Sequence, residues 1–527
     1  MPQITKTTIT YNEKDWLAGL HPQYGYKKTI SQKLGNFSKN QYNFNAFDDL
    51  GYAKNGFLGV DFDHEERVTS RLEKIILGSD GYYYAIDSAR LVHRLSNAGG
   101  SLSDVESISP FPYQTGGAGT VNSDIIEHYV TNSALKAILF SYNTPTGGDV
   151  GAIDLDTGLS TLAFMSTRPD GAQTLASAYP HPMCVGHDDK LYIGNGRYLF
   201  MYDYADTSNT DGKLFRNVLI LPKNFVIKSI QKLQPRTLVI FGQDGLFYGN
   251  GGPSKAFFWD YLSLDPYQIK DLSDRLFVTS FEYKGTIGTL TYDNTNEMKV
   301  RVFNGSEFEV ITRLRNLWVS SAEVPSIGCI DVVDNEIYIH MSDQNYGYIF
   351  KYGNNNNLEN SLSVIGRSVA GVSGYKAGAL KYIKQYDNFI MSTGLDDDKS
   401  ATIQYQDKTK YAEDGFWYSD LTDIGYERIQ ITGITVYFAD EFTGGRTISL
   451  SLTDRYNTYA ISGLTNLATV TATNRIYRVK PINNTGGTPI PPLDGIGLNL
   501  TWGKGSGSSV TPIINKVVLD YKPVTIN

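Results

Sequence analysis

The stretch that decides the fold is "KIILGSDGYYYAIDSARLVHRLS", residues 74–96. It begins with an apolar run, turns at Ser-Asp-Gly, and continues with a tyrosine-rich run that alternates polar and apolar residues. A short polar break separates this run from a third one of the same kind. Asp-Gly between two alternating runs is typical of a tight β-hairpin, because glycine readily adopts the positive φ that such turns need. The stretch therefore predicts antiparallel strands with a turn at Asp80-Gly81.

The same theme recurs along the chain from residue 72 to about residue 395. Further units begin at Lys136, Asp188, Arg236, Arg275, Cys329 and Leu380. Their spacing of roughly 40 to 60 residues is typical of four-stranded propeller blades. Seven such units close into a ring without exposed sheet edges, so we predict an all-β fold with a roughly seven-bladed β-propeller over 72–395. A pair of ordinary β-sandwiches is the alternative. Further hairpin turns are predicted at Asn195-Gly196 and Asp244-Gly245.

Residues 396–527 have a different character. Their strand-like runs alternate strictly, are richer in threonine and isoleucine, and no longer follow the blade format. This pattern predicts a C-terminal β-sandwich that is jelly-roll-like. Trp417 and Trp502 fall in this segment. They are candidates for a face that stacks on sugars, although they could equally be core residues.

Residues 1–71 fit neither pattern. The segment is polar, dotted with aromatic residues and poor in regular alternation, so we predict an extended N-terminal arm that becomes ordered on contact with a partner. Its aromatic side chains are the expected anchors at an interface with other subunits. These anchors are Trp16, Tyr24, Tyr26, Phe37, Tyr42, Phe44 and Phe47.

Composition excludes several classes of protein. The 527 residues carry a net charge of −8 and no long run of lysine or arginine, so no surface for gripping nucleic-acid phosphates is expected. No apolar run is long enough to span a bilayer, and the first residues lack the pattern of a secretion signal. The two cysteines, Cys184 and Cys329, are too few for a disulfide framework and are expected to be core residues.

Chemistry-bearing motifs are weak throughout the sequence. Ala152, Asp154, Thr157 and Gly158 in "GAIDLDTGLSTLAF" (151–164) match part of a quinoprotein blade signature, but this match occurs once and lacks the lysine and tryptophan that follow it there. We interpret it as a hairpin turn. The seven histidines are scattered, with no pair at metal-binding spacing. We therefore predict no cofactor, no metal and no enzymatic activity.

The chain as a whole resembles structural proteins of tailed-bacteriophage virions. The residues that carry the resemblance are "WLAGLHPQYG" (16–25), "DDLGYAKNGF" (48–57), and the ending with "FWYSDLTDIGYERIQITGITVYF" (416–438) and "IINKVVLDYKPV" (513–524). The comparison is with the nozzle, or tail tubular protein B, group of short-tailed phages, whose members carry propeller-like domains.

The resemblance implies a non-enzymatic part of the tail or neck, located in the virion. Its partners would be copies of itself in a ring and neighbouring tail or neck proteins, with genomic DNA passing through without specific binding. A receptor- or glycan-binding propeller at a tail tip or cell surface is the alternative, and a glycan-cleaving propeller enzyme is the third possibility.

Overall fold

In the computed structural model the described residues form β-strands and turns, and no α-helix occurs among them. Those residues are 7–11, 38–42, 60–68, 71–88, 92–98, 101–108, 124–130, 135–144, 147–158, 160–161, 175–202, 214–245, 252–293, 297–315, 324–342, 346–353, 361–367, 376–384, 388–394, 401–411, 414–419, 428–438, 441, 447–471, 473–503 and 514–524. Contacts divide the chain into two compact units. One comprises His64–Gly347 and Ala370–Tyr405, and the other Met1–Asp63, Tyr348–Val369 and Gln406–Asn527.

Seven antiparallel sheets of four strands each form the blades of a propeller. Blade one contains β4 (Leu72–Leu77), β5 (Tyr83–Asp87), β6 (Val92–Ala98) and β7 (Ser101–Ile108). Blade two contains β8 (Ile125–Val130), β9 (Leu135–Thr144), β10 (Gly147–Asp154) and β11 (Ser160–Thr161). Blade three contains β12 (Met183–Val185), β13 (Leu191–Asn195), β14 (Tyr198–Tyr202) and β15 (Leu214–Ile220). Blades four and five contain β16 (Phe225–Leu233), β17 (Thr237–Asp244), β18 (Ser254–Trp259) and β19 (Gln268–Asp271); and β20 (Leu276–Tyr283), β21 (Thr286–Tyr292), β22 (Glu297–Phe303) and β23 (Phe308–Arg315). Blades six and seven contain β24 (Ile330–Val333), β25 (Glu336–Ser342), β26 (Gly347–Gly353) and β27 (Ser361–Arg367); and β28 (Lys376–Ile383), β29 (Asn388–Gly394), β30 (Ala401–Tyr411) and β3 (Val60–Val68).

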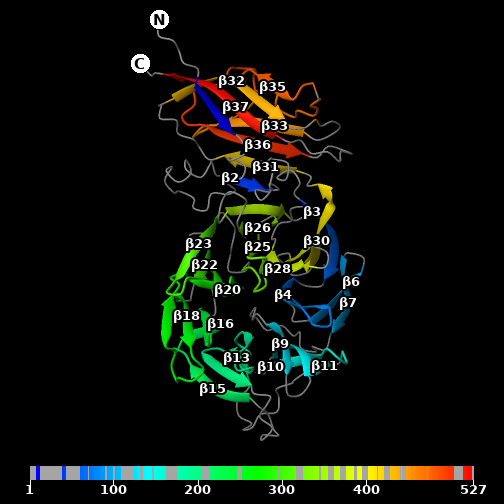
Figure 1. Ribbon diagram of the computed structural model, residues 1–527, viewed down its shortest axis with the longest axis vertical. Coiled ribbons are helices and arrows are strands. Elements are labelled where there is room, and N and C mark those ends of the chain that lie inside the picture. Colours follow the sequence, from blue (N-terminus) through cyan, green and yellow to red (C-terminus); the bar gives the residue numbers. More distant parts are fainter. Residues whose placement is uncertain are drawn as a thin grey trace. The chain divides into compact units, whose positions relative to one another are not determined.

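The first strands of the blades close into a ring. β4, β8, β12, β16, β20, β24 and β28 contact one another in this order, and β28 contacts β4 again. Figure 1 shows the blades following one another in chain order around one axis. The prediction of an all-β, seven-bladed propeller is therefore confirmed.

The seventh blade differs from the sequence-based boundaries. Its outermost strand is β3, from the N-terminal region, and its third strand is β30. Both lie outside 72–395. The chain thus uses a strand that precedes blade one to complete blade seven, which joins the two ends of the ring.

Tight turns shape the blades as their sequences require. Gly81, Gly196 and Gly245 have φ values of 87°, 59° and 88°, a backbone conformation that residues with a Cβ rarely adopt. The predicted hairpin turns at Gly81, between β4 and β5, and at Gly196, between β13 and β14, are confirmed. Gly245 follows β17, but residues 246–251 of the connection to β18 lie outside the described residues, so a hairpin turn there remains a prediction. In the "GAIDLDTGLSTLAF" stretch, Asp154 Oδ1 accepts the backbone N–H groups of Asp156 and Thr157, so this segment is the hairpin turn expected of it.

Buried apolar clusters fill the spaces between neighbouring blades. The cluster between blades three and four combines Tyr192 and Leu199 with Phe257 and Trp259, among others. Some aromatic rings lie across a glycine of the adjacent strand. Gly151 of β10 pairs with Phe140 of β9, and a Cβ at Gly151 would collide with the Phe140 ring. The absence of a side chain there is a packing requirement of the blade.

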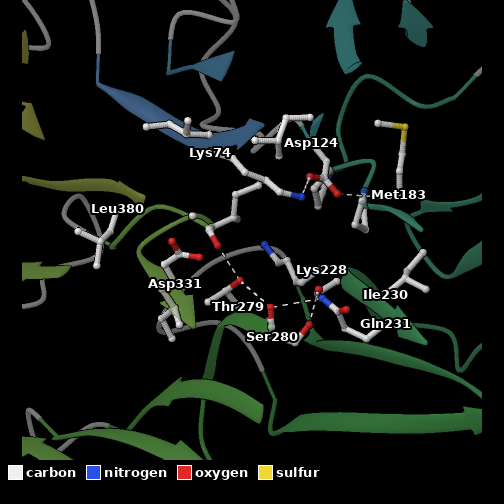
Figure 2. A pocket seen from close by; sticks show the side chains of 18 of the residues that line it. Lys74, Asp124, Met183, Lys228, Ile230, Gln231, Thr279, Ser280, Asp331 and Leu380 are labelled. Atoms are coloured by element: carbon white, nitrogen blue, oxygen red, sulfur yellow. Dashed lines mark hydrogen bonds and ion pairs between the residues drawn. The ribbon is translucent and has the colours of Figure 1, made fainter. Parts of the chain in front are cut away.

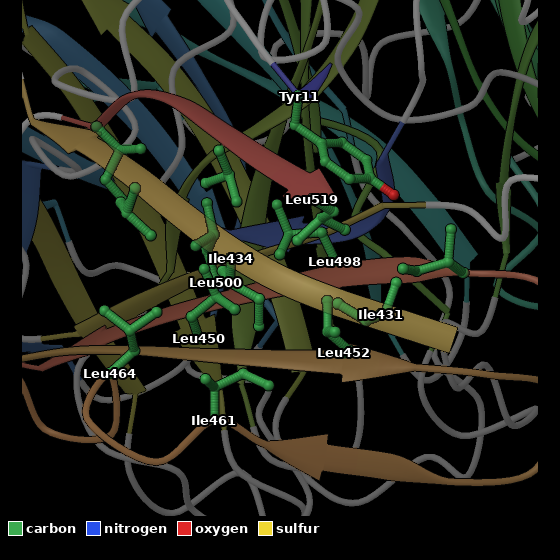
Figure 3. Close-up of a cluster of buried hydrophobic side chains, with 14 of the residues drawn as sticks. Tyr11, Ile431, Ile434, Leu450, Leu452, Ile461, Leu464, Leu498, Leu500 and Leu519 are labelled. Carbon is green, nitrogen blue, oxygen red and sulfur yellow. The ribbon is translucent and has the colours of Figure 1, made fainter. Parts of the chain in front are cut away.

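Two further sheets lie in the other unit. The first has the order β1 (Thr7–Tyr11), β37 (Ile514–Val524), β32 (Arg428–Phe438) and β35 (Ile476–Val479). The second has the order β2 (Ser38–Tyr42), β31 (Asp414–Ser419), β36 (Gly497–Gly503), β33 (Thr447–Thr453) and β34 (Thr458–Ala460). Residues of both contribute to one apolar cluster, in which Ile431, Leu450, Leu500 and Leu519 are buried (Figure 3). A jelly-roll-like sandwich remains a prediction.

The N-terminal region differs from the extended arm that its sequence predicts. All three segments of 1–71 that the structure describes are strands paired with later parts of the same chain: β1 with β37, β2 with β31, and β3 in the seventh blade. Tyr11 of β1 is fully buried in the apolar cluster. The alternating sequence "TTITY" of β1 is only five residues long, and no other strand-like sequence adjoins it. Its partner β37 lies at the other end of the chain, so the sequence alone does not identify it as a strand.

Candidate functional site

The innermost strands enclose a cavity of about 240 Å³ around the propeller axis (Figure 2). All seven blades contribute to its lining, in chain order through Lys74, Asp124, Met183, Lys228, Ser280, Asp331 and Lys381. The lining is polar, although the strands that form it also supply the apolar clusters between the blades. This axial cavity is the first candidate site.

Irregular pairing brings polar residues to the axis. In β16 the register with β17 shifts between Ile227 and Ser229, which makes Lys228 the extra residue of a bulge. β4 and β20 have similar shifts, around Glu73 and Val278. A bulge interrupts the strict alternation of side chains and redirects them. In Figure 2 the ammonium group of Lys228 is directed into the cavity.

Asp124 connects three blades. Its Oδ1 accepts hydrogen bonds from Lys74 Nζ of blade one at 2.6 Å and from the Ile125 N–H of its own blade at 2.8 Å. Its Oδ2 accepts the Met183 N–H of blade three at 3.0 Å. Both carboxylate oxygens are thus engaged by donors of the fold, and this residue acts as a cross-link of the ring.

Asp331 does the same between blades six and seven. Its Oδ1 accepts Lys381 Nζ at 3.0 Å and the Val332 N–H at 3.2 Å, and its Oδ2 accepts the Tyr382 N–H at 2.7 Å. Asp331 is partly buried, and its carboxylate is both paired with a lysine and hydrogen-bonded to backbone N–H groups.

Hydroxyl groups link the blades between these two carboxylates. Ser229 of blade four and Ser280 of blade five share a hydrogen bond of 2.6 Å between their Oγ atoms. Thr279 Oγ1 donates to the Ile327 carbonyl, just before blade six, at 2.7 Å. The Gln231 amide donates to the Ser280 carbonyl at 3.4 Å. Polar contacts beside the cavity therefore join blades one to three and blades four to seven.

Lys228 is the unusual member of the cavity lining. Burial lowers the pKa of its ammonium group to about 8, because the charged form loses solvation inside the propeller. Lys74 forms an ion pair with Asp124, and Lys381 forms one with Asp331. The described lining thus contains one more lysine than aspartate.

A second candidate site is the hairpin that connects β18 and β19 on blade four. Here Leu262 and Leu264 are 89% and 88% exposed, while Tyr267 and Ile269 are each 56% exposed. β19 is the outermost strand of its blade. We call these four residues the blade-four apolar surface.

Hydrogen bonds fix the hairpin that displays this surface. Asp260 Oδ1 accepts the N–H groups of Leu262 at 3.0 Å and Ser263 at 2.8 Å, and the Ser263 hydroxyl at 2.7 Å. The bonds from Ser263, the backbone one foremost, lower the pKa of the Asp260 carboxyl to about 2. Trp259 Nε1 donates to the Ser263 carbonyl at 2.7 Å. The two leucines therefore project from an ordered turn.

Tyr261, in the same hairpin, packs against blade three. Its ring meets the ring of Tyr192 edge-on, with centroids 5.4 Å apart, and its hydroxyl accepts the His187 N–H at 3.2 Å. Tyr261 has a φ of 69°, which is rare for a residue with a large side chain. This packing on blade three compensates for the backbone strain and holds the turn in place.

Among the described residues, those predicted from the sequence as site residues belong to neither candidate site. Trp417 pairs with Leu500, and Trp502 pairs with Ile448, in the second C-terminal sheet. Sugar stacking remains a prediction.

The arm anchors are not brought together as a described surface. Tyr42 lies in β2, in register with Phe416. The other anchors lie outside the described residues: Trp16, Tyr24, Tyr26, Phe37, Phe44 and Phe47. Their role as interface residues remains a prediction.

Three further features of the described residues bear on function: the cysteines, potential metal-ligand clusters and potential membrane-spanning helices. Cys184 and Cys329 are free thiols, and burial raises the pKa of each to about 12. No group of three or more histidine, cysteine, aspartate or glutamate side chains suited to a metal ion occurs within the described part of the chain. The described residues also contain no helix with the length and apolarity needed to cross a membrane.

Comparison with known proteins bears on the propeller fold and on the function predicted from the sequence. No family model and no curated protein matches the chain. Among solved structures, the β-propeller domain of Cps50 (Swd1) from Myceliophteria thermophila is similar with a TM-score of 0.41 and 8% identity, over 64% of this chain and 99% of that one. The Dos1 propeller is similar with a TM-score of 0.38 and 10% identity, over 64% of this chain and 78% of that one. These are propellers of proteins other than phage tail components, so the predicted function as a nozzle-like part of a phage tail or neck is wrong by this comparison.

Sequence reasoning missed both candidate sites. Lys228 belongs to an otherwise ordinary strand, and nothing in "FVIKSIQKL" reveals that it meets six other blades at an axis. The hairpin left a clearer signal. "WDYLSLDPY" (259–267) places two leucines among turn-forming aspartate, serine and proline, where a buried role is improbable.

Proposed function

We propose that this chain is a non-catalytic scaffold that binds another protein chain through the blade-four apolar surface. The observation that carries the proposal is the pair Leu262 and Leu264, each nearly fully exposed on an ordered turn. Large exposed apolar side chains held on an ordered turn are candidates for protein–protein contact.

The fixed geometry of the hairpin favours a binding role for its exposed leucines. Asp260 and Trp259 hold the turn through four hydrogen bonds, so little conformational entropy is lost when the leucines bind. Tyr267 adds an aromatic ring whose hydroxyl shares a hydrogen bond of 2.9 Å with Thr237. Apolar side chains that are positioned before binding are typical of interface anchors.

A scaffold role also agrees with the state of the axial carboxylates. Asp124 and Asp331 each receive one ammonium group and two backbone N–H groups. A general acid or base needs to exchange a proton with a substrate. Carboxylates that cross-link blades are poorly suited to this task, which supports a non-catalytic function.

Site-specific photo-crosslinking in cells that make the protein tests the proposal. A photoreactive amino acid replaces Leu264 in one variant and Tyr456 in the control variant. Tyr456 is 77% exposed on the other unit, so it controls for exposure alone. We expect a discrete protein adduct from position 264, identified by mass spectrometry, and no adduct from position 456.

A second measurement separates a second copy of this chain from a different protein. Light scattering gives the mass of the purified chain, which is 58.5 kDa as a monomer. If the partner is a second copy, Leu264→Asp converts a larger species into this monomer. If the partner is a different protein, the wild type is already monomeric and Leu264→Asp abolishes the adduct that a photoreactive residue in place of Leu262 forms. Absence of a specific adduct at positions 262 and 264 would refute the proposal.

A further inference from the structure

The outermost strand of the first C-terminal sheet has an open edge. β35 lies beside β32 (Figure 1) and pairs with no other strand of the described chain. The Phe438 N–H donates to the Arg475 carbonyl at 2.9 Å, so Arg475 and every second residue after it bond to β32. The N–H and C=O groups of Ile476 and Arg478 are therefore directed away from β32. An edge strand presents such groups as a template for a further strand.

The side chains of β35 alternate between the apolar cluster and solvent. Tyr477 and Val479 pack against the cluster. Ile476 is 52% exposed, and Arg478 and the following Lys480 are exposed on the same side. A strand added to this edge would continue both faces of the sheet. Its inward side chains would extend the apolar cluster, and its outward side chains would lie next to the two cations.

This edge is cationic in a chain whose net charge is −8. The segment between Asp454 and Asp494 contains three arginines and one lysine but no aspartate or glutamate. Arg478 and Lys480 form no ion pair with any residue that the structure describes. Lys516 of β37 adds a cation to the same sheet, with its Nζ 4.4 Å from the centroid of the Tyr437 ring. The charges around the open edge therefore favour an acidic partner.

We propose that β35 pairs with an extended acidic segment of another protein, which adds a strand to this sheet. A peptide strand supplies donors and acceptors for the open backbone groups, and its acidic side chains complement the cations. A second copy of this chain is disfavoured, because antiparallel pairing of two β35 strands brings like charges close together. This edge and the blade-four apolar surface belong to different units, so either proposal can fail alone.

Fluorescence anisotropy with the full chain at pH 7 and low salt tests the charge preference. The probe is a capped, fluorescein-labelled peptide in which four Glu alternate with three Val, and the reference peptide carries Lys in place of Glu. We expect saturable binding of the Glu peptide only, weakened at least about tenfold by Arg478→Glu. Lys522→Glu is the matched control, because Lys522 is exposed on β37, which has a neighbouring strand on each side. Its binding should stay close to that of the wild type.

A second pair of variants tests strand addition separately from charge. Ile476→Pro removes one N–H directed to the open edge and leaves every cation in place. Proline is tolerated at the first residue of a strand, and Ile476 begins β35. Ile476→Ala keeps the N–H and controls for the lost side chain. We expect Ile476→Pro to bind the Glu peptide about fivefold more weakly than Ile476→Ala, with equal thermal unfolding of the two variants as the check on folding.

Three results would overturn the proposal. The first is absence of saturable binding of the Glu peptide, or equal binding of the Lys peptide. The second is equal binding by Ile476→Pro and Ile476→Ala, which would mean that the cations attract acidic peptides without strand addition. The third is tighter binding of a single-stranded oligothymidylate that displaces the Glu peptide, which would assign this edge to nucleic acid.

Discussion

The propeller axis and the C-terminal sheets are built from the same kind of alternating strand, yet they bury different chemistry. The C-terminal cluster is formed by isoleucine, leucine, valine and aromatic residues from both sheets. The axis is surrounded by aspartates, lysines and hydroxyl groups that bond from blade to blade. An apolar core needs only complementary shape, whereas a polar axis needs every donor and acceptor to be positioned. The difference predicts that the C-terminal cluster is sensitive to lost volume and the axis to lost polar partners.

The C-terminal cluster should be the more sensitive region to lost volume. Leu500 is fully buried in β36, so Leu500→Ala should lower the free energy of unfolding by about 4 kcal/mol through lost burial and a cavity. Hydrogen exchange resolved by peptide would locate the loss in the strands around it. Thr501→Ala, on the other sheet face, is the control. Equal effects of both substitutions would show that the cluster is not the stabilising core.

The second-largest loss of stability is expected at the propeller axis, where a substitution removes a polar hydrogen-bond partner. Asp124→Ala removes the acceptor for Lys74 and for the N–H groups of Ile125 and Met183. We expect a loss of about 3 kcal/mol in unfolding free energy, since buried donors are left without partners. Asp124→Asn keeps the shape and one acceptor and should lose less. Denaturant titration measures both, and a harmless Asp124→Ala would mean that the axis does not depend on this cross-link.

Packing inside a blade should give a smaller effect. Gly151→Ala places a Cβ against the Phe140 ring and should cost about 2 kcal/mol, as overpacking of a core does. Phe140→Leu should relieve part of this cost, so the double variant should be more stable than the sum of the two single effects implies. A thermodynamic cycle of the four proteins measures this coupling. Strict additivity would contradict direct contact between the two positions.

The sequence was sufficient to predict the propeller because each blade is local. Strand, turn and strand are neighbours in the chain, and Gly81, Gly196 and Gly245 mark their connections at positive φ. Long-range pairings could not be predicted in the same way. β3 and β1 complete sheets with strands hundreds of residues later, and no local pattern encodes such partners. The axial site was hidden for the same reason, since Lys74, Lys228 and Lys381 meet only after the ring closes.

Lys228→Met should have an effect of opposite sign. The pKa of Lys228 is lowered from 10.5 to about 8, so its charged form destabilises the folded state most fully below pH 8. As the pH rises from 8 to 10.5, the folded protein releases this proton before the unfolded chain does, and the cost disappears. We expect the variant to be more stable than the wild type at pH 7.

The pH dependence of this stability difference tests most directly the central claim that the axis retains a cation at the expense of stability. Unfolding free energies of the wild type and Lys228→Met are measured by denaturant titration between pH 6 and pH 11. Lys74, Asp124, Asp331 and Lys381 also line the cavity but are unchanged between the two proteins, so their contributions largely cancel. The account predicts a gain for the variant that is constant below pH 8 and declines to near zero by pH 10.5. A variant that is less stable at pH 7, or a difference that does not change with pH, would contradict it.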